Sequence, residues 1–358
     1  MNKNRFLHYI ILFAALLLWS CADNDNPGGE IPNDGKALLI LNEGSMNGNN
    51  ATLARYDLLE EEIISDYFNL VNKDKLGDVA NDMLQYGSKI YIAVNKSGTI
   101  EVLEAATGRS LRQIEMKIVG GQSKEPRRLA VHGGKVYVTS FDDTVTRIDT
   151  LSLAIDGSVT VGMDPEGIAI KNNRIYVANS GGLNWENGYD NSLSVIDLNT
   201  FTEEKKIEVG TNPGSLYADS QGDIYLTVTG NYGDEPGAFK MIRSGSSTVE
   251  TIAGIASPQK FVISNNMAYI ICGAWEEPHK VVVYDCLKEE IVSDSFISDD
   301  TEIPIMNNIS VDPFTGDLFV ASTDYVHPGD VYWFDKTGTL KNRLIAVGIN
   351  PSVVLIQD

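Results

Sequence analysis

The sequence predicts an all-β protein folded as a seven-bladed β-propeller. Two observations predict this fold: a segment of short alternating strands recurs along the chain, and the two chain ends carry complementary parts of one further copy. A repeat of roughly 40 to 50 residues that contains only short strands is typical of propellers. We therefore expect each repeat to form one four-stranded sheet, or blade.

The repeat is clearest in the middle of the chain. Each copy opens with a proline and an apolar run, continues with a strand that ends in Ser or Asn, and closes with a strand that ends in Asp. One copy spans residues 126–149 and the next spans residues 165–197, and looser copies begin at Pro213, Pro258 and Pro304. Alternation of apolar and polar residues in such short runs predicts β-strands rather than helices.

The two ends of the chain predict how the ring closes. Residues 350–356 read as the opening strand of a repeat with nothing after it, whereas residues 36–42 match a second strand. The C-terminal strand should therefore complete blade one, which contains the N-terminal strand. Blade two opens at residues 77–79, where the proline is missing, so the openings number seven. Closure removes the exposed sheet edges of a linear array.

Recurring acidic residues and two cysteines have structural interpretations. An aspartate that ends a third strand can accept hydrogen bonds from the amides of the following turn. Five aspartates are expected to do so: Asp57, Asp149, Asp197, Asp285 and Asp335. Cys272 and Cys286 end neighbouring strands of one hairpin, which places them about five rungs apart, too far for a disulfide. We expect both to be small buried apolar residues.

The N-terminal segment has the pattern of an export signal. Residues 1–20 carry Lys3 and Arg5 and then an apolar run too short to span a bilayer comfortably, which predicts a signal peptide. Residues 18–21 resemble a bacterial lipobox, so Cys21 would become the lipidated N-terminus. An ordinary cleavage site with an incidental cysteine remains the alternative. Residues 21–35 read as a flexible tether, and residues 36–358 as the propeller.

Charge restricts the classes of ligand. The chain has 28 Lys and Arg against 49 Asp and Glu, a net charge of −21, and losing the signal peptide would remove two more positive charges. Such a surface repels phosphate backbones and anionic lipid headgroups. We expect no nucleic-acid partner, and membrane contact through the lipid anchor only. Neutral and cationic ligands remain open.

Motifs for catalysis are scarce. None of His132, His279 and His327 belongs to a metal-binding motif, and no Gly-x-Ser-x-Gly elbow occurs. We therefore expect a binding protein and not an enzyme, with no catalytic residues, metal or cofactor. A propeller hydrolase or lactonase is the alternative from another class. It would need a metal or an acid/base group in the central channel, where Glu166 and Asp78 are the candidates.

The loops that join second to third strands indicate the binding face. They are tight in blades two and three and long in blades one, four, five, six and seven, and all should emerge on one face. Exposed aromatic rings among amides and carboxylates suit a large, partly apolar ligand. The alternative is that each ring packs over its own loop. The predicted ligand-binding residues are Asn42, Glu43, Asn95, Phe141, Asp142, Asn184, Trp185, Tyr189, Tyr232, Trp275, Glu276, Tyr325 and His327.

These repeats resemble a known family. The units at residues 165–170, 175–180 and 194–197 look like the YncE-like, YVTN-repeat seven-bladed propellers. Residues 41–53 and 76–98 look like the branch of surface lipoproteins found in Bacteroidetes. The resemblance covers essentially all of residues 36–358.

That branch includes BtuG-type lipoproteins, which bind cobalamin and cap an outer-membrane TonB-dependent transporter. The resemblance therefore implies that the loop face captures cobalamin (vitamin B12) or a related corrinoid as a ligand and passes it to such a transporter. Acidic residues directly behind Cys21 resemble the signal that sends these lipoproteins to the outer leaflet of the outer membrane, so we expect the propeller to face the cell exterior. A surface glycan-binding protein is the alternative, because sugars also stack on Trp and Tyr.

Overall fold

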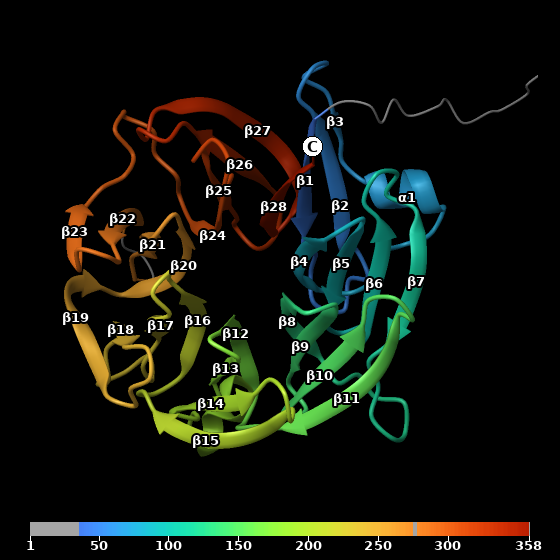
Figure 1. Ribbon diagram of the computed structural model, residues 1–358. Coiled ribbons are helices and arrows are strands. Elements are labelled where there is room, and N and C mark those ends of the chain that lie inside the picture. Colours follow the sequence, from blue (N-terminus) through green and yellow to red (C-terminus); the bar gives the residue numbers. More distant parts are fainter. Residues whose placement is uncertain (1–35, 275–277, 358) are drawn as a thin grey trace, which may run out of the picture. The chain divides into compact units, whose positions relative to one another are not determined.

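Seven four-stranded antiparallel sheets surround a central axis (Figure 1). The computed structural model describes residues 36–274 and 278–357. The seven-bladed propeller predicted from the repeats is confirmed. The predicted signal peptide, the tether, Cys21, Trp275 and Glu276 lie outside the described residues.

Blade one combines the C-terminal strand with the first three strands, and blades two to four follow in chain order. Blade one consists of β28 (Pro351–Gln357), β1 (Ala37–Asn42), β2 (Thr52–Asp57) and β3 (Ile63–Ile64). Blade two consists of β4 (Ala80–Tyr86), β5 (Lys89–Val94), β6 (Thr99–Glu104) and β7 (Ser110–Glu115). Blade three consists of β8 (Pro126–His132), β9 (Lys135–Ser140), β10 (Thr144–Asp149) and β11 (Ala154–Thr160). Blade four consists of β12 (Pro165–Lys171), β13 (Arg174–Asn179), β14 (Ser192–Asp197) and β15 (Thr202–Glu208).

The last three blades repeat the pattern, with the first strand of each nearest the axis. Blade five consists of β16 (Pro213–Ala218), β17 (Ile224–Val228), β18 (Ala238–Ile242) and β19 (Val249–Ala256). Blade six consists of β20 (Pro258–Ser264), β21 (Met267–Cys272), β22 (Lys280–Asp285) and β23 (Glu290–Ser293). Blade seven consists of β24 (Met306–Val311), β25 (Leu318–Ser322), β26 (Pro328–Phe334) and β27 (Leu340–Ile349). Pro304, expected to open blade seven, lies two residues before β24.

Helical structure is sparse in the described part of the chain. The α-helix α1 (Tyr67–Asn72) links blades one and two, and the 3-10 segment η1 (Gly182–Asn187) lies in the loop after β13. Tyr67 of α1 is buried and its hydroxyl donates to the carbonyl of Thr107 at 2.9 Å, which fixes the helix against blade two. None of the helices in residues 36–274 and 278–357 is long and apolar enough to cross a membrane.

The ring closes as the two chain ends predict. Strand β1 pairs with β2 on one side and with the C-terminal strand β28 on the other. Leu39 lies opposite Leu355, and Ile40 lies opposite Val354. Both edges of β1 are therefore paired, so this apolar strand exposes no unpaired backbone amides at the edge of blade one.

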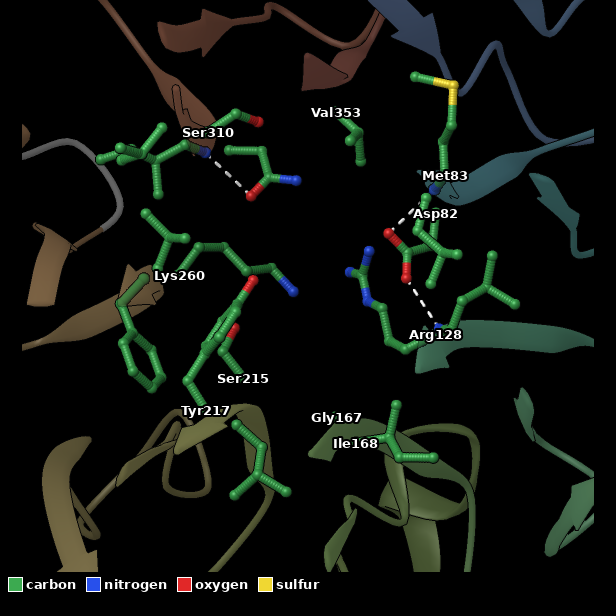
Figure 2. Close-up of a pocket in the computed structure, with 18 of the residues that line it drawn as sticks. Asp82, Met83, Arg128, Gly167, Ile168, Ser215, Tyr217, Lys260, Ser310 and Val353 are labelled. Atoms are coloured by element: carbon green, nitrogen blue, oxygen red, sulfur yellow. Dashed lines mark hydrogen bonds between the residues drawn. The ribbon is translucent and has the colours of Figure 1, made fainter. Parts of the chain in front are cut away.

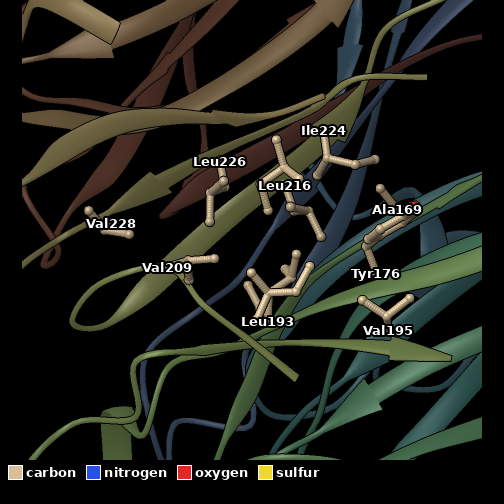
Figure 3. Close-up of a cluster of buried hydrophobic side chains, with 12 residues drawn as sticks. Ala169, Tyr176, Leu193, Val195, Val209, Leu216, Ile224, Leu226 and Val228 are labelled. Carbon is tan, nitrogen blue, oxygen red and sulfur yellow. The ribbon is translucent and has the colours of Figure 1, made fainter. Parts of the chain in front are cut away.

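The hydrophobic core lies between the faces of neighbouring blades. Because successive side chains of a strand point to opposite faces, one strand serves two cores. In β17, Ile224 and Leu226 pack against blade four, whereas Tyr225 packs against blade six. Figure 3 shows the cluster between blades four and five, in which Leu193 and Leu216 lie together. No blade buries its apolar faces alone, so the ring stabilises all of them together.

The aspartates at the ends of third strands bind the following turns, as predicted. In each case Oδ1 accepts hydrogen bonds from backbone amides two to four residues further on, at 2.7–3.1 Å. The prediction of two free buried cysteines is also confirmed: Cys272 and Cys286 are 2 % and 3 % exposed and form no disulfide.

Candidate functional site

One recurring contact places all the second-to-third strand loops on one side of the propeller. In every blade the residue just after the second strand donates its amide to a carbonyl just before the inner strand. Glu43 donates to Asn350 at 2.9 Å, and Phe141 donates to Glu125 at 3.1 Å. These loops and the starts of the inner strands therefore share one side, which we call the loop face.

A groove crosses the loop face over blades five, six and seven. Its volume is about 800 Å³. Tyr232, from the loop after β17, and Tyr325, from the loop after β25, lie on its wall, and His279 and Met306 also line it. The amide of Met306 donates to Nδ1 of His279 at 3.0 Å, which fixes the orientation of the ring. The groove is large enough for a ligand of substantial size.

Three predicted aromatic residues are exposed on the loop face. Trp185 of η1 is 60 % exposed, Tyr232 is 79 % exposed and Tyr325 is 50 % exposed. Tyr189 lies near Tyr232, with 6.3 Å between ring centroids. Tyr232 and Tyr325 both have positive φ angles, 57° and 66°. A bulky residue in this left-handed region is strained, a feature that concentrates at ligand-binding loops.

Two predicted ligand contacts are buried instead. Asn42 is fully buried, and its Nδ2 donates to the carbonyl of Val347 at 3.1 Å and to Thr52 Oγ1 at 3.0 Å. The amide of Asn95, which is 3 % exposed, donates to the carbonyl of Pro126 at 3.3 Å. The structure thus gives these two side chains a structural role, because they join neighbouring strands at the end of β1 and just after β5.

Phe141 and Asp142 support the loop face from within. The guanidinium of Arg127 lies 4.5 Å from the centroid of the Phe141 ring. Asp142 Oδ2 lies 2.8 Å from Lys124 Nζ. Both predicted residues therefore have partners within the protein.

The remaining predicted residues lie on exposed loops or at the channel mouth. Asn184 is half-buried in η1, where its Oδ1 accepts from Asn187 at 3.0 Å. The ring of His327 lies 2.7 Å from Asp324 Oδ2. The backbone amide of His327, and then its side chain, lower the pKa of Asp324 to about 2. Glu43 lies at the mouth, between the starts of β28 and β4.

The central channel contains a second cavity, of about 430 Å³, lined by the inner strands (Figure 2). Its residues can be aligned by register. In each blade, one inner-strand residue lies opposite the end of the second strand, and the residue two positions later lines the channel. We call this set the channel ring; it consists of Asp82, Arg128, Gly167, Ser215, Lys260, Asn308 and Val353.

A β-bulge near the start of each inner strand changes the direction of the side chains next to the channel-ring positions. In blade three the register shifts between Pro126 and Leu129. Consecutive strand residues normally point to opposite faces, but a bulge relaxes this rule. As a result both Arg127 and Arg128 contact one carboxylate, that of Glu166: Arg127 Nε lies 2.7 Å from Oε2, and Arg128 Nη2 lies 3.0 Å from Oε1.

The channel ring and its neighbours have perturbed charge states. Burial, and then the nearby charge of Arg128, lower the pKa of Lys260 to about 8. Burial also raises the pKa of Glu43 and of Asp82. Although burial alone would raise the pKa of Glu166, Arg127 and Arg128 hold it below its ordinary value. Such perturbed groups in a cavity are a common mark of functional sites.

Glu166 was predicted from the sequence as a channel candidate, whereas the basic residues of the channel were not predicted. Glu166 does line the channel, whereas Asp78 precedes β4 and is not among the lining residues. Arg128 and Lys260 stand two residues after the opening prolines Pro126 and Pro258. An alignment of the repeats on their opening prolines would have identified Arg128 and Lys260, because both occupy the same position two residues later. In the described part of the chain no three His, Cys, Asp or Glu side chains are placed to hold a metal ion.

Comparison with family models and with curated proteins gives no match to this sequence. Solved structures do match in fold. Hydrazine synthase of Kuenenia stuttgartiensis is 17% identical with a TM-score of 0.57, over 70% of this chain and 74% of that one. The dihydro-heme d1 dehydrogenase NirN is 10% identical with a TM-score of 0.58, over 89% and 74%. A chain of the mitotic checkpoint complex is 10% identical with a TM-score of 0.57, over 96% and 89%. At these identities the likeness establishes the propeller fold.

Proposed function

We propose that this protein is a cell-surface binding protein that captures a small ligand on the loop face of its propeller. One observation carries the proposal: the groove of about 800 Å³ opens on the same face as the exposed rings of Trp185, Tyr232 and Tyr325. Exposed rings on strained loops beside a groove have no core to fill, and their faces are open to a ligand.

Cobalamin or a related corrinoid is the first ligand to test. The groove offers aromatic rings next to amides and backbone carbonyls, which suits a wide ring system fringed with amide groups. The resemblance to BtuG-type lipoproteins names this ligand. A surface glycan is the second candidate, and the tilted pair of Tyr189 and Tyr232 favours it because sugars stack on exposed aromatic faces.

A binding titration tests both ligands. The soluble form that begins after Cys21 is titrated calorimetrically with cyanocobalamin and with a panel of oligosaccharides. The corrinoid proposal expects saturable binding below micromolar concentration. If cyanocobalamin does not bind at high micromolar concentration while an oligosaccharide does, the glycan is the ligand. If neither binds, the protein captures a ligand of another class.

We further propose that the protein is anchored to the outer membrane through Cys21, faces the cell exterior and delivers its ligand to a TonB-dependent transporter. The pattern of the N-terminal residues and the resemblance support this location and partner. Protease shaving of intact cells tests the location: Cys21→Ala should release the chain, and neutralising Asp23 and Asp25 should protect it from cleavage. Cross-linking on intact cells followed by mass spectrometry tests the partner, because a transporter should be joined to residues of the loop face.

A further inference from the structure

We propose that the loop-face mouth of the central channel is a binding site for one small anionic group, a carboxylate or a phosphate, held between Lys260 and Arg128. This site is distinct from the groove, although Lys260 lines both cavities. The proposal does not depend on which ligand the groove binds. The anion is either a free molecule or part of a larger ligand that extends from the groove.

The ammonium group of Lys260 has unused hydrogen-bonding capacity. Its side chain is 32 % exposed, and among the described residues its ion-pair partner is Glu166, whose Oε1 lies 3.9 Å from Nζ. That distance is beyond a hydrogen bond, and an ammonium group carries three donors. A partly buried cation with no close acceptor has a strong preference for an anionic partner.

Three cations share the single carboxylate of Glu166. The carboxylate of Glu166 already accepts from Arg127 and from Arg128, at 2.7 Å and 3.1 Å from their Nε atoms. Lys260 is the third cation on the same carboxylate. Its charge is therefore incompletely balanced by the contacts of Glu166.

Lys260 and Arg128 also approach each other from opposite sides of the channel. Figure 2 shows the two side chains extending toward one another across the cavity. Like charges that face one another repel, and the charge of Arg128 is one cause of the lowered pKa of Lys260. An anion between the two groups would convert this repulsion into two attractions.

The surroundings favour a single small anion. Ser215 and Asn308 belong to the same channel ring and are neutral and polar. The carboxylate of Asp82 is held by the amides of Met83 and Leu129, which donate to its two oxygens at 3.0 Å and 2.8 Å. Together with Glu43 at the mouth, this carboxylate repels polyanions, so the site should accept one carboxylate or phosphate and reject a chain of them.

Titration with simple anions tests the site directly. The mature protein is titrated with sodium phosphate and with sodium acetate by calorimetry, and ionic strength is held constant with sodium chloride. We expect saturable binding of at least one anion in the millimolar range and a rise in melting temperature on binding. Lys260→Met should weaken the binding at least tenfold, whereas Lys260→Arg should retain it.

Lys135→Met is the matched control. Lys135 is 28 % exposed, similar to Lys260, but lies at the start of β9 and pairs with Asp149 at 2.8 Å. The Lys135→Met substitution should therefore leave anion binding unchanged. Absence of saturable binding to the wild-type protein, or equal affinity in Lys260→Met, would overturn the proposal. Because neither cobalamin nor a glycan is used, failure of the groove proposal leaves this result unaffected. Tighter binding of phosphate than of acetate would identify phosphate as the preferred group, and the reverse would identify a carboxylate.

Discussion

Arg127 reaches from blade three to Glu166 in blade four, with 2.7 Å between Nε and Oε2. Arg128, the next residue, contacts the other oxygen of the same carboxylate. The carboxylate is 9 % exposed, so both pairs are largely shielded from water. This contact therefore joins blades three and four at the channel wall.

Replacement of Glu166 by Gln should destabilise the protein. The substitution keeps the shape but leaves Arg127 and Arg128 partly buried without a counter-charge, which costs about 3–5 kcal/mol in comparable buried pairs. Because the folded-state pKa of Glu166 is lowered, its contribution is complete above the ordinary pKa of 4.5 and is lost as the pH falls toward the folded value. Urea unfolding at pH 7 and at acidic pH measures both effects.

Glu204→Gln provides the control for this measurement. Glu204 pairs with Arg174 at 2.8 Å, but both side chains are at least one third exposed. Its loss should cost no more than about 1 kcal/mol. Equal destabilisation by the two substitutions would show that Glu166 does not join the blades.

Lys260 should make stability depend on alkaline pH. Its pKa is lowered from 10.5 to about 8 by burial and by Arg128. Between these two values the unfolded chain binds more protons than the folded protein, so the free energy of unfolding should rise with pH. Glu166 and Glu43 partly offset this shift, and Arg127 adds to it.

The comparison with Lys260→Met isolates this effect. The free energy of unfolding of the wild type, minus that of the variant, should increase by about 1–2 kcal/mol from pH 8 to pH 10.5. This increase is smaller than the full pKa shift would give, because the side chain of Lys260 is about one third exposed and solvent screens its charge. Tyrosine ionisation occurs in both proteins and cancels in the difference. A constant difference across this range would contradict the lowered pKa.

Closure of the ring should depend on β28. Val354 is 5 % exposed and belongs to the core between blades seven and one, whereas its neighbour Val353 is only half-buried and lies outside that core. Val354→Ala should cost about 2 kcal/mol through the loss of two buried methyl groups, and Val353→Ala should cost much less. Deletion of residues 351–357 should cost several kcal/mol, because it leaves β1 with an unpaired apolar edge. Thermal unfolding of the three variants measures this order.

The groove proposal predicts which aromatic residues matter. Tyr232→Ala and Tyr325→Ala should each weaken ligand binding by about 1–3 kcal/mol, because each removes an exposed ring from the groove wall. Trp185→Ala tests whether the ligand extends to blade four. His132→Ala, at the far end of β8, should have no effect. The titration uses whichever ligand binds the wild type, and unchanged affinity in both tyrosine variants would place the ligand outside the groove.

The fold was predictable because its signals are local. Pro126 and Pro165 mark where inner strands begin, and the aspartates that end third strands mark where turns follow. The closing strand was predictable because residues 350–356 repeat an opening strand that has no continuation. Each of these features depends on a few adjacent residues and recurs, so that one clear copy clarifies the weaker ones.

The site was only partly predictable, because it depends on contacts between blades. Asn42 and Asn95 looked like loop residues. Asn42 instead ends β1 and Asn95 directly follows β5, and the side-chain amide of each donates to a backbone carbonyl of another blade. The side chains of Arg127 and Arg128 converge on Glu166 only because a β-bulge re-aims them, and bulges leave no sequence mark of their own. The repeat alignment identifies the positions of such residues, but not their partners.

The channel ring has a consequence for how this protein can change. Each of its seven positions comes from a different blade and lies outside the cores that hold neighbouring blades together. Where the side chain forms no hydrogen bond with another described residue, as at Ser215 or Lys260, a single substitution can alter the chemistry of the channel without repacking any sheet. Gly167 is the exception, because an added Cβ would lie 2.2 Å from the carbonyl oxygen of Gly214. The propeller thus separates the residues that keep it folded from those that natural selection can vary to suit a new ligand.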